Sequence, residues 1–239
     1  MQIGRALRFH MAKNAHGQYC VPVESMHRPC ALTVMRGRVW EAATLKAIAR
    51  HYRGGDIVTA GTYFGDFLPF LCRQADAHGA HVWGFEPVTV NYLCASATRA
   101  FNALTNCTLA NAGLGSEPGR LTIKTHDNKG RPLGGGSRIV AKREGLPAAR
   151  FDAIEIATID AVVDARSVGL IQLDIEGHEI AALRGASAVI ERCRPLLVLE
   201  GHGGADLPAD PYLRELSGRF GYHRIDRQDQ NVFLAAGTD

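Results

Sequence analysis

The sequence lacks paired cysteines, long apolar runs and a strong charge of either sign. Its six cysteines lie far apart and none forms a C-x-x-C pair, so neither a zinc knuckle nor a dense disulfide framework is indicated. No stretch approaches the roughly 18 apolar residues of a membrane span, and the first residues contain no apolar signal-peptide core. We therefore expect a cytoplasmic protein without a membrane partner.

The small net charge and the absence of metal-binding motifs make further classes of function unexpected. The formal net charge is only +3 and the basic residues are scattered, so nucleic acid is not an expected partner. No H-E-x-x-H motif and no evenly spaced set of carboxylates defines a metal site. The prediction therefore names no metal, and a divalent cation shared by Asp174, Glu176 and Glu200 stays open as an alternative.

The composition is that of a packed globular protein, with 46% hydrophobic and 21% charged residues in a chain of 239. From residue 40 onward, short β-branched runs alternate with helical patterns, which is typical of βαβ units. We expect an α/β fold with a mostly parallel seven-stranded sheet, helices on both faces and an antiparallel C-terminal hairpin. The expected strands are 56–60, 81–85, 107–110, 168–173, 196–199, 222–226 and 231–235, with further β-rich segments at 120–125 and 151–158. The expected helices are 40–52, 66–74, 89–101, 178–195 and 212–220.

Two segments fall outside this alternation. Residues 1–39 contain prolines 22 and 29 and few periodic stretches, and we expect them to form a cap or an oligomer contact on a domain formed by residues 40–239. The stretch 126–150 contains a run rich in glycine and arginine, which predicts a mobile loop over the site.

The first candidate site is a glycine turn followed by an acidic residue. Gly61 and Gly65 flank a predicted strand-to-helix turn, where backbone can approach a ligand and the N–H groups of the new helix can face it. Helix–strand packing alone would also explain these glycines. Glu86 ends the next strand, where an acidic residue can accept both ribose hydroxyls of an adenosine cofactor, although a solvated loop glutamate is the simpler alternative.

The second candidate site is the segment 174–179, which reads D-I-E-G-H-E. It places three carboxylates and an imidazole at the carboxyl end of a central strand, an arrangement that is costly unless a ligand compensates it. We expect Asp174, Glu176 and His178 to supply the catalytic base. Helix capping would explain one acid but not all of them. Glu200 and His202 end the next strand and could add a second imidazole.

Several motifs together carry a family resemblance: Gly84-Phe-Glu-Pro87, Ala112-Gly-Leu-Gly115, and Ile171 to Glu179 running into Leu183-Arg-Gly-Ala186. Over roughly residues 37–235, the chain resembles the FkbM-type family of S-adenosylmethionine (SAM)-dependent methyltransferases. The resemblance implies a Rossmann-like class I methyltransferase fold, SAM as the cofactor and a small-molecule or carbohydrate acceptor that is methylated on a hydroxyl.

The resemblance also implies where the cofactor lies. The expected cofactor-binding residues are Gly61, Tyr63, Phe64, Gly65, Asp66, Glu86, Pro87, Asn111, Ala112 and Asp174. The segment from Thr59 to Gly65 departs from the acidic residue and G-A-N-x-G usual in the family, and Asp66 or a backbone contact would then take over part of the grip on SAM. The alternatives are a SAM-binding member without catalysis, and a nicotinamide-dependent oxidoreductase, which normally shows a G-x-G-x-x-G turn that this chain lacks.

Overall fold

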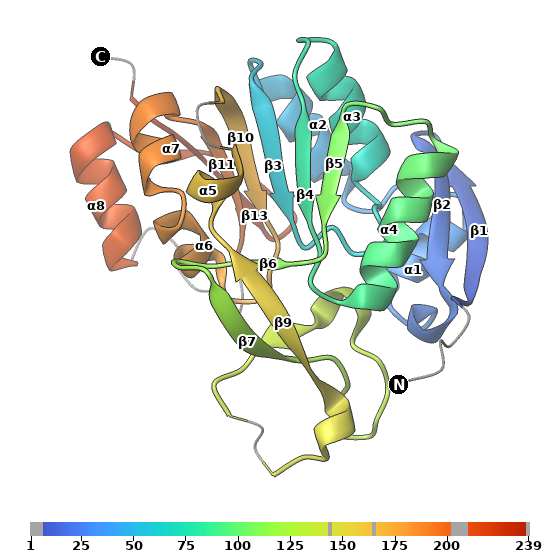
Figure 1. The fold of residues 1–239 in the computed structure, drawn as a ribbon. Helices are drawn as coiled ribbons and strands as arrows, with labels where there is room; N and C mark the ends of the chain where they lie inside the picture. The colour runs from blue at the N-terminus through green and yellow to red at the C-terminus, as the bar shows by residue number, and fades with distance from the viewer. Residues whose placement is uncertain (1–6, 143–144, 164–165, 202–209, 238–239) are drawn as a thin grey trace.

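The computed structural model describes residues 7–142, 145–163, 166–201 and 210–237, arranged as in Figure 1. Its strands are β1 (Phe9–Asn14), β2 (Gly17–Pro22), β3 (Asp56–Ala60), β4 (Val82–Phe85), β5 (Cys107–Ala110), β6 (Gly113–Leu114), β7 (Gly119–Lys124), β8 (Arg138–Ile139), β9 (Phe151–Ala157), β10 (Val168–Leu173), β11 (Leu196–Glu200), β12 (His223–Gln228) and β13 (Asn231–Ala235). Its α-helices are α1 (Pro29–Met35), α2 (Ala42–His51), α3 (Leu68–Asp76), α4 (Thr89–Phe101), α5 (Ile159–Val163), α6 (Glu179–Arg184), α7 (Ser187–Cys193) and α8 (Pro211–Phe220). Short 3-10 turns are η1 (Val23–Ser25), η2 (Gly134–Gly136) and η3 (Ala148–Arg150).

The central sheet has seven strands in the order β12-β13-β11-β10-β3-β4-β5. Neighbouring strands from β11 to β5 are parallel, whereas β13 is antiparallel to both β11 and β12. The α/β class is therefore confirmed, but the sheet is mixed and not parallel throughout. Two smaller sheets accompany it, and of their strands the sequence predicted only the β-rich segments 120–125 and 151–158. The reversal has a simple cause, because the tight turn between β12 and β13 is too short for the crossover that parallel strands require.

Helices cover both faces of this sheet because its side chains alternate along each strand. On β3, Ile57 packs with α2 and α3, whereas Val58 packs on the opposite face with α5, α6 and α7. β10 and β11 alternate in the same way, so the sheet separates two apolar clusters. Among the described residues, no helix has the length and apolar character needed to cross a bilayer.

A second sheet lies beside the carboxyl ends of the central strands, at the bottom of Figure 1. Its strand order is β6-β9-β7-β8, and the long antiparallel pair β7 and β9 confirms the two β-rich segments expected there. Ile123, Ile154 and Ile156 form a small core with Val88 at the start of α4. This sheet therefore places the loop that follows β7 close to the edge where the parallel strands end.

Residues 7–39 contain more regular secondary structure than their sequence suggested. β1 and β2 form an antiparallel hairpin, and β2 docks on α4, where the Cys20 amide donates to Thr98 Oγ1 at 3.0 Å. Tyr19 and Phe64 are fully buried and pack edge to face in the cluster that joins this hairpin to the main domain. The sequence did not predict this hairpin. Its strands pair with each other and β2 is buried against α4, and neither contact is visible in the local sequence pattern.

Two predicted helices differ from the observed ones. The helix expected at 178–195 is broken into α6 and α7. The break lies at Gly185, which packs so closely on the residue after β6 that a Cβ would lie 2.0 Å from the Gly115 carbonyl oxygen. Asp160 of α5 then caps the new helix by accepting hydrogen bonds from the Ala188 and Val189 amides. The helix expected from Asp66 begins only at Leu68, which leaves Asp66 in the turn.

Candidate active site

The point where the strand order reverses lies between β3 and β10, and ligands of open α/β sheets bind at such a point. Gly61 follows β3 and Asp174 follows β10, so these two residues begin the connections that separate there. Gly61 has a φ of +80°, and a Cβ on it would lie only 1.7 Å from the Asp174 carbonyl oxygen. Packing between the two connections therefore requires glycine at position 61 whether or not a ligand is bound.

Two cavities open at this edge. The larger has a volume of about 350 Å³ and is lined by Arg28, Pro29, Cys30, Trp40, Glu41, Thr59, Gly61, Thr62, Tyr63, Asp66, Phe67, Leu68, Gly135, Gly136, Gln172, Asp174, Glu176, Glu200 and Gln230. The smaller has about 30 Å³ and is lined by Ala60, Gly61, Phe85, Glu86, Pro87, Ala112, Gly113, Leu114, Ile123, Gly134, Gly135, Ser137, Ile139, Asp174, Ile175 and His178. Gly61, Gly135 and Asp174 line both, so the cavities meet at the reversal point.

The backbone of the glycine turn is oriented differently from the prediction. The Gly61 and Thr62 amides both donate to the Phe85 carbonyl, and the Gly65 amide donates to the Thr62 carbonyl. These N–H groups therefore fix the turn against β4 and do not face a ligand. Because α3 begins only at Leu68, these amides do not belong to its first turn, and an approach of the α3 N–H groups to a ligand stays a prediction.

Glu86 is buried at the end of β4, with 4% of its surface exposed. One carboxylate oxygen accepts from the Tyr63 amide at 2.8 Å, and the other accepts from the Val88 amide at 2.9 Å and from the Asn91 side chain at 3.4 Å. Burial raises the pKa of this carboxyl to about 7. The three hydrogen bonds lower the pKa, but their effect is smaller than that of burial. The oxygen facing Tyr63 keeps acceptor capacity for a further donor.

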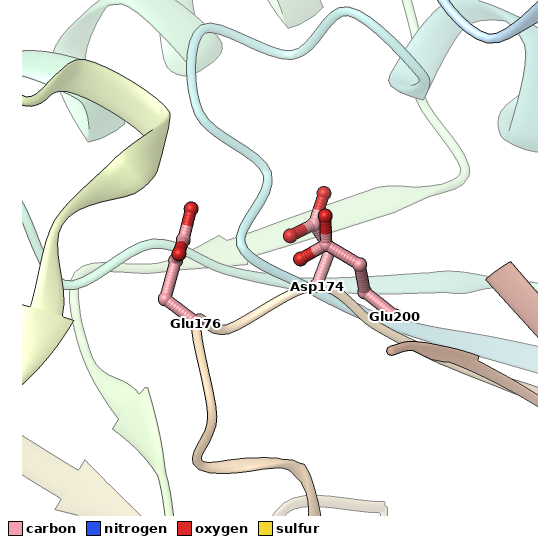
Figure 2. A group of neighbouring side chains, drawn as sticks. All are labelled: Asp174, Glu176 and Glu200. Atoms are coloured by element: carbon pink, nitrogen blue, oxygen red, sulfur yellow. The ribbon is translucent and has the colours of Figure 1, made fainter. Parts of the chain in front are cut away.

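Three carboxylates gather at the mouth of the larger cavity. Asp174, Glu176 and Glu200 each offer an oxygen within 4.8 Å of the other two. Figure 2 shows the carboxyl groups of Asp174 and Glu200 next to each other and that of Glu176 pointing to the same side from farther along the connection. Burial, and then the neighbouring Glu200, raise the pKa of Asp174 well above its usual range. The cluster has the spacing and ligand chemistry for a divalent cation.

Two further acidic residues, Glu41 and Asp66, also line the larger cavity. The sequence did not indicate that they would lie together. Glu41 precedes α2 with a φ of +43°, and its carboxylate accepts from the Asn231 side-chain amide at 2.8 Å. Burial raises the pKa of Glu41 to about 7 and that of Asp66, whose carboxyl contacts the Cys30 thiol, to about 6. No local motif marks Glu41, because α2 reaches the site only through the packing of the helices on the sheet.

The third acid of the 174–179 segment has a structural role. Glu179 is 4% exposed, and its carboxylate accepts from the Ile175 amide at 3.1 Å and the Gly177 amide at 3.2 Å. These bonds close the connection on which Glu176 sits at a φ of +57°, a conformation that costs free energy for a residue with a Cβ. Glu179 is therefore a positioning residue for Glu176.

His178 lies apart from the carboxylates with which it was grouped. It borders the smaller cavity, together with Glu86 and Pro87, whereas Glu176 borders the larger one. Burial lowers the pKa of His178, which favours the neutral imidazole. His202, the other candidate imidazole, lies outside the described residues.

The structure brings most of the expected cofactor-binding residues to the cavities. Gly61, Tyr63, Asp66 and Asp174 line the larger one, and Glu86, Pro87 and Ala112 line the smaller one. Phe64 and Gly65 line neither cavity. Phe64 is instead fully buried in the apolar cluster that joins the N-terminal hairpin to the main domain. Asn111 also lines neither, since its amide donates to the Glu86 carbonyl at 2.8 Å and to the Pro87 carbonyl at 3.1 Å.

The chain matches one protein family and is similar to several solved structures. The Methyltransferase FkbM domain family matches residues 59–223. A structure of methyltransferase FkbM from Methylobacillus flagellatus is 23% identical with a TM-score of 0.52, over 76% of this chain and 43% of that one, so the chain spans less than half the length of that protein. At this identity the likeness supports a shared fold.

Two more distant structures are also similar. An rRNA methylase from Streptococcus thermophilus is 13% identical with a TM-score of 0.46, over 82% of this chain and 95% of that one. A Pyrococcus abyssi tRNA (uracil-54, C5)-methyltransferase in complex with S-adenosyl-L-homocysteine is 11% identical with a TM-score of 0.48, over 98% and 44%. No curated protein matches the chain.

Proposed function

The chain belongs to the FkbM methyltransferase family, and from this premise we propose that it transfers a methyl group from SAM to a hydroxyl of a sugar, glycan or natural-product acceptor. The observation that carries the proposal is the meeting of two unlike cavities at Gly61 and Asp174, where the strand order reverses. In this proposal the adenosine of SAM lies in the smaller cavity, its amino-acid end and the acceptor share the larger one, and the reacting atoms lie where the cavities join.

The smaller cavity has the chemistry of an adenosine site. Phe85, Leu114 and Ile139 give it apolar walls, and Glu86 brings a carboxylate with spare acceptor capacity for ribose hydroxyls. The larger cavity adds the Thr62 hydroxyl, which is buried and without a hydrogen-bond partner among the described residues. A polar ligand would satisfy that hydroxyl, so the residues present fit SAM.

When bound, SAM supplies an activated methyl group on a sulfonium. The chain's own part is to align the acceptor oxygen, exclude water and accept the hydroxyl proton. Glu176 is our choice of base, because burial and the neighbouring Glu200 raise the pKa of Asp174, which favours the protonated form of the Asp174 carboxyl. Glu176 would accept the hydroxyl proton of the acceptor, while bound SAM would supply the methyl group to the acceptor oxygen and leave as S-adenosylhomocysteine.

Calorimetry with SAM, S-adenosylhomocysteine and NAD tests the cofactor assignment. We expect binding of the first two and none of NAD, since the G-T-Y-F-G turn at 61–65 is not a dinucleotide turn. Tight NAD binding without SAM binding would contradict the proposal and favour an oxidoreductase.

A second assay tests the reaction itself. Release of S-adenosylhomocysteine with polyhydroxylated acceptors, and not with matched acceptors whose hydroxyls are already methylated, is the expected result. SAM binding without transfer to any hydroxylated acceptor would instead favour a member of the family that binds the cofactor and lacks catalysis.

A further inference from the structure

The larger cavity is acidic except at one place. Five carboxylates line it, from Glu41, Asp66, Asp174, Glu176 and Glu200. Arg28 is the single basic side chain among the described residues that line it. A cavity with this charge pattern suits a ligand that is mainly cationic but carries one anionic group.

Arg28 is positioned without being neutralised. Its backbone is fixed, because its amide donates to the Ser25 carbonyl at 2.9 Å and its carbonyl accepts from the Leu32 amide at 3.0 Å. Its guanidinium forms no hydrogen bond or ion pair with any residue in the described part of the chain. The N–H donors of this half-buried guanidinium therefore lack a direct acceptor in the described part of the chain, and a bound carboxylate would supply one.

The cavity wall is shaped around this side chain. A Cβ on Gly136 would lie 2.6 Å from an Arg28 terminal nitrogen and 3.4 Å from Glu176 Oε1. A side chain at position 136 would displace the end of the Arg28 side chain from its place beside Glu176. The 3-10 turn of three glycines, η2, thus holds Arg28 at the cavity that Asp174 also lines.

We propose that Arg28 binds the carboxylate of the amino-acid end of the cofactor, while carboxylates of the cavity other than Glu176 receive its ammonium group. This inference rests on the proposed function, since it takes SAM as the ligand. An α-amino acid end is a zwitterion, and one guanidinium among several carboxylates is complementary to it. Arg28 precedes the family match at 59–223, so the N-terminal segment completes the cofactor site from outside the matched domain.

The test compares two ligands that differ only in this end. S-adenosylhomocysteine carries the amino acid, and 5′-methylthioadenosine has the adenosine and the sulfur without it. In calorimetric titrations of the full chain, Arg28→Gln should weaken S-adenosylhomocysteine binding about 10- to 100-fold and leave 5′-methylthioadenosine binding unchanged. Arg28→Lys, which keeps the charge but loses the bidentate geometry, should fall between Arg28→Gln and the wild type.

Arg36→Gln is the matched control, because Arg36 is an exposed arginine at the other end of α1 and lines neither cavity. It should leave both affinities unchanged. If Arg28→Gln weakens the binding of both ligands equally, or the binding of neither, the assignment of Arg28 is overturned and the proposed function is not affected. Wild-type protein that binds neither ligand would overturn the proposed function and this inference together.

Discussion

At the scale of the residue, Gly61 is a position where the fold has no room for a side chain. Gly61→Ala places a Cβ 1.7 Å from the Asp174 carbonyl oxygen, so the connections after β3 and β10 must separate. Gly79→Ala is the matched control, because Gly79 has a φ of +64° but a Cβ there would have no atom within 4 Å, and its cost of about 1–2 kcal/mol is backbone strain alone. In thermal melts we expect a clearly larger loss for Gly61→Ala than for Gly79→Ala, and equal losses would contradict the packing argument.

Glu176 is the residue on which the chemistry is proposed to depend. Glu176→Gln keeps the shape of the side chain but cannot accept a proton, so methyl transfer should slow by about 10²–10⁴-fold with S-adenosylhomocysteine affinity largely retained. Glu117→Gln, at an exposed position that lines neither cavity, should leave both quantities unchanged. Full turnover by Glu176→Gln would move the base to the Asp174 and Glu200 pair.

At the scale of the element, the loop around η2 closes the smaller cavity. That cavity has a volume of about 30 Å³, which is room for about one water molecule and not for an adenosine. Gly134, Gly135, Ser137 and Ile139 all line it, so we predict that this part of the loop moves when the proposed cofactor binds.

Hydrogen exchange measures that movement. The Leu133 and Gly136 amides are hydrogen-bonded, to the Thr125 and Leu133 carbonyls, yet we expect them to exchange much faster than amides of β10 in the free protein. Exchange at these two positions should slow when S-adenosylhomocysteine is added. Protection equal to that of β10 in the free protein would show that the loop does not open.

At the scale of the whole molecule, the buried acids make stability depend on pH. Burial raises the pKa of Glu41 and of Glu86 to about 7, above the value of 4.5 for an exposed glutamate. The folded protein therefore binds more protons than the unfolded chain between about pH 4.5 and 7, so the stability that these groups contribute is present at low pH and is lost as the pH rises through 7. The pKa of Asp127 and of Asp226 is lowered to about 2, which affects stability only at more acidic pH.

The measurement is a melting temperature at pH 6.5 and at pH 8.0. This interval lies above most of the opposing effect of His178, whose pKa is lowered by burial. We expect a decrease on the order of 1 kcal/mol, or about 2–4 °C, at the higher pH. Glu41→Gln should reduce the decrease, and a melting temperature that rises from pH 6.5 to 8.0 would contradict the assignment.

The sequence by itself determined the central elements and the position of the acidic segment. The patterns that predicted β3, β10 and α4 are local, because side chains alternate along a strand and recur every three to four residues along a helix. The segment from Asp174 to Glu179 was also identifiable, since its charge at the end of an apolar strand is unusual. These features need only neighbouring residues to be recognised.

Which side chains meet at the site follows only from the tertiary structure. Arg28 reaches the larger cavity because the N-terminal hairpin buries Tyr19 against Phe64, which is a contact between residues far apart in the chain. His178 and Glu176 are two residues apart but border different cavities, because Glu179 bonds the connection into a turn that separates them. Long-range packing and side-chain direction leave no periodic trace in a sequence, and they fix the composition of this site.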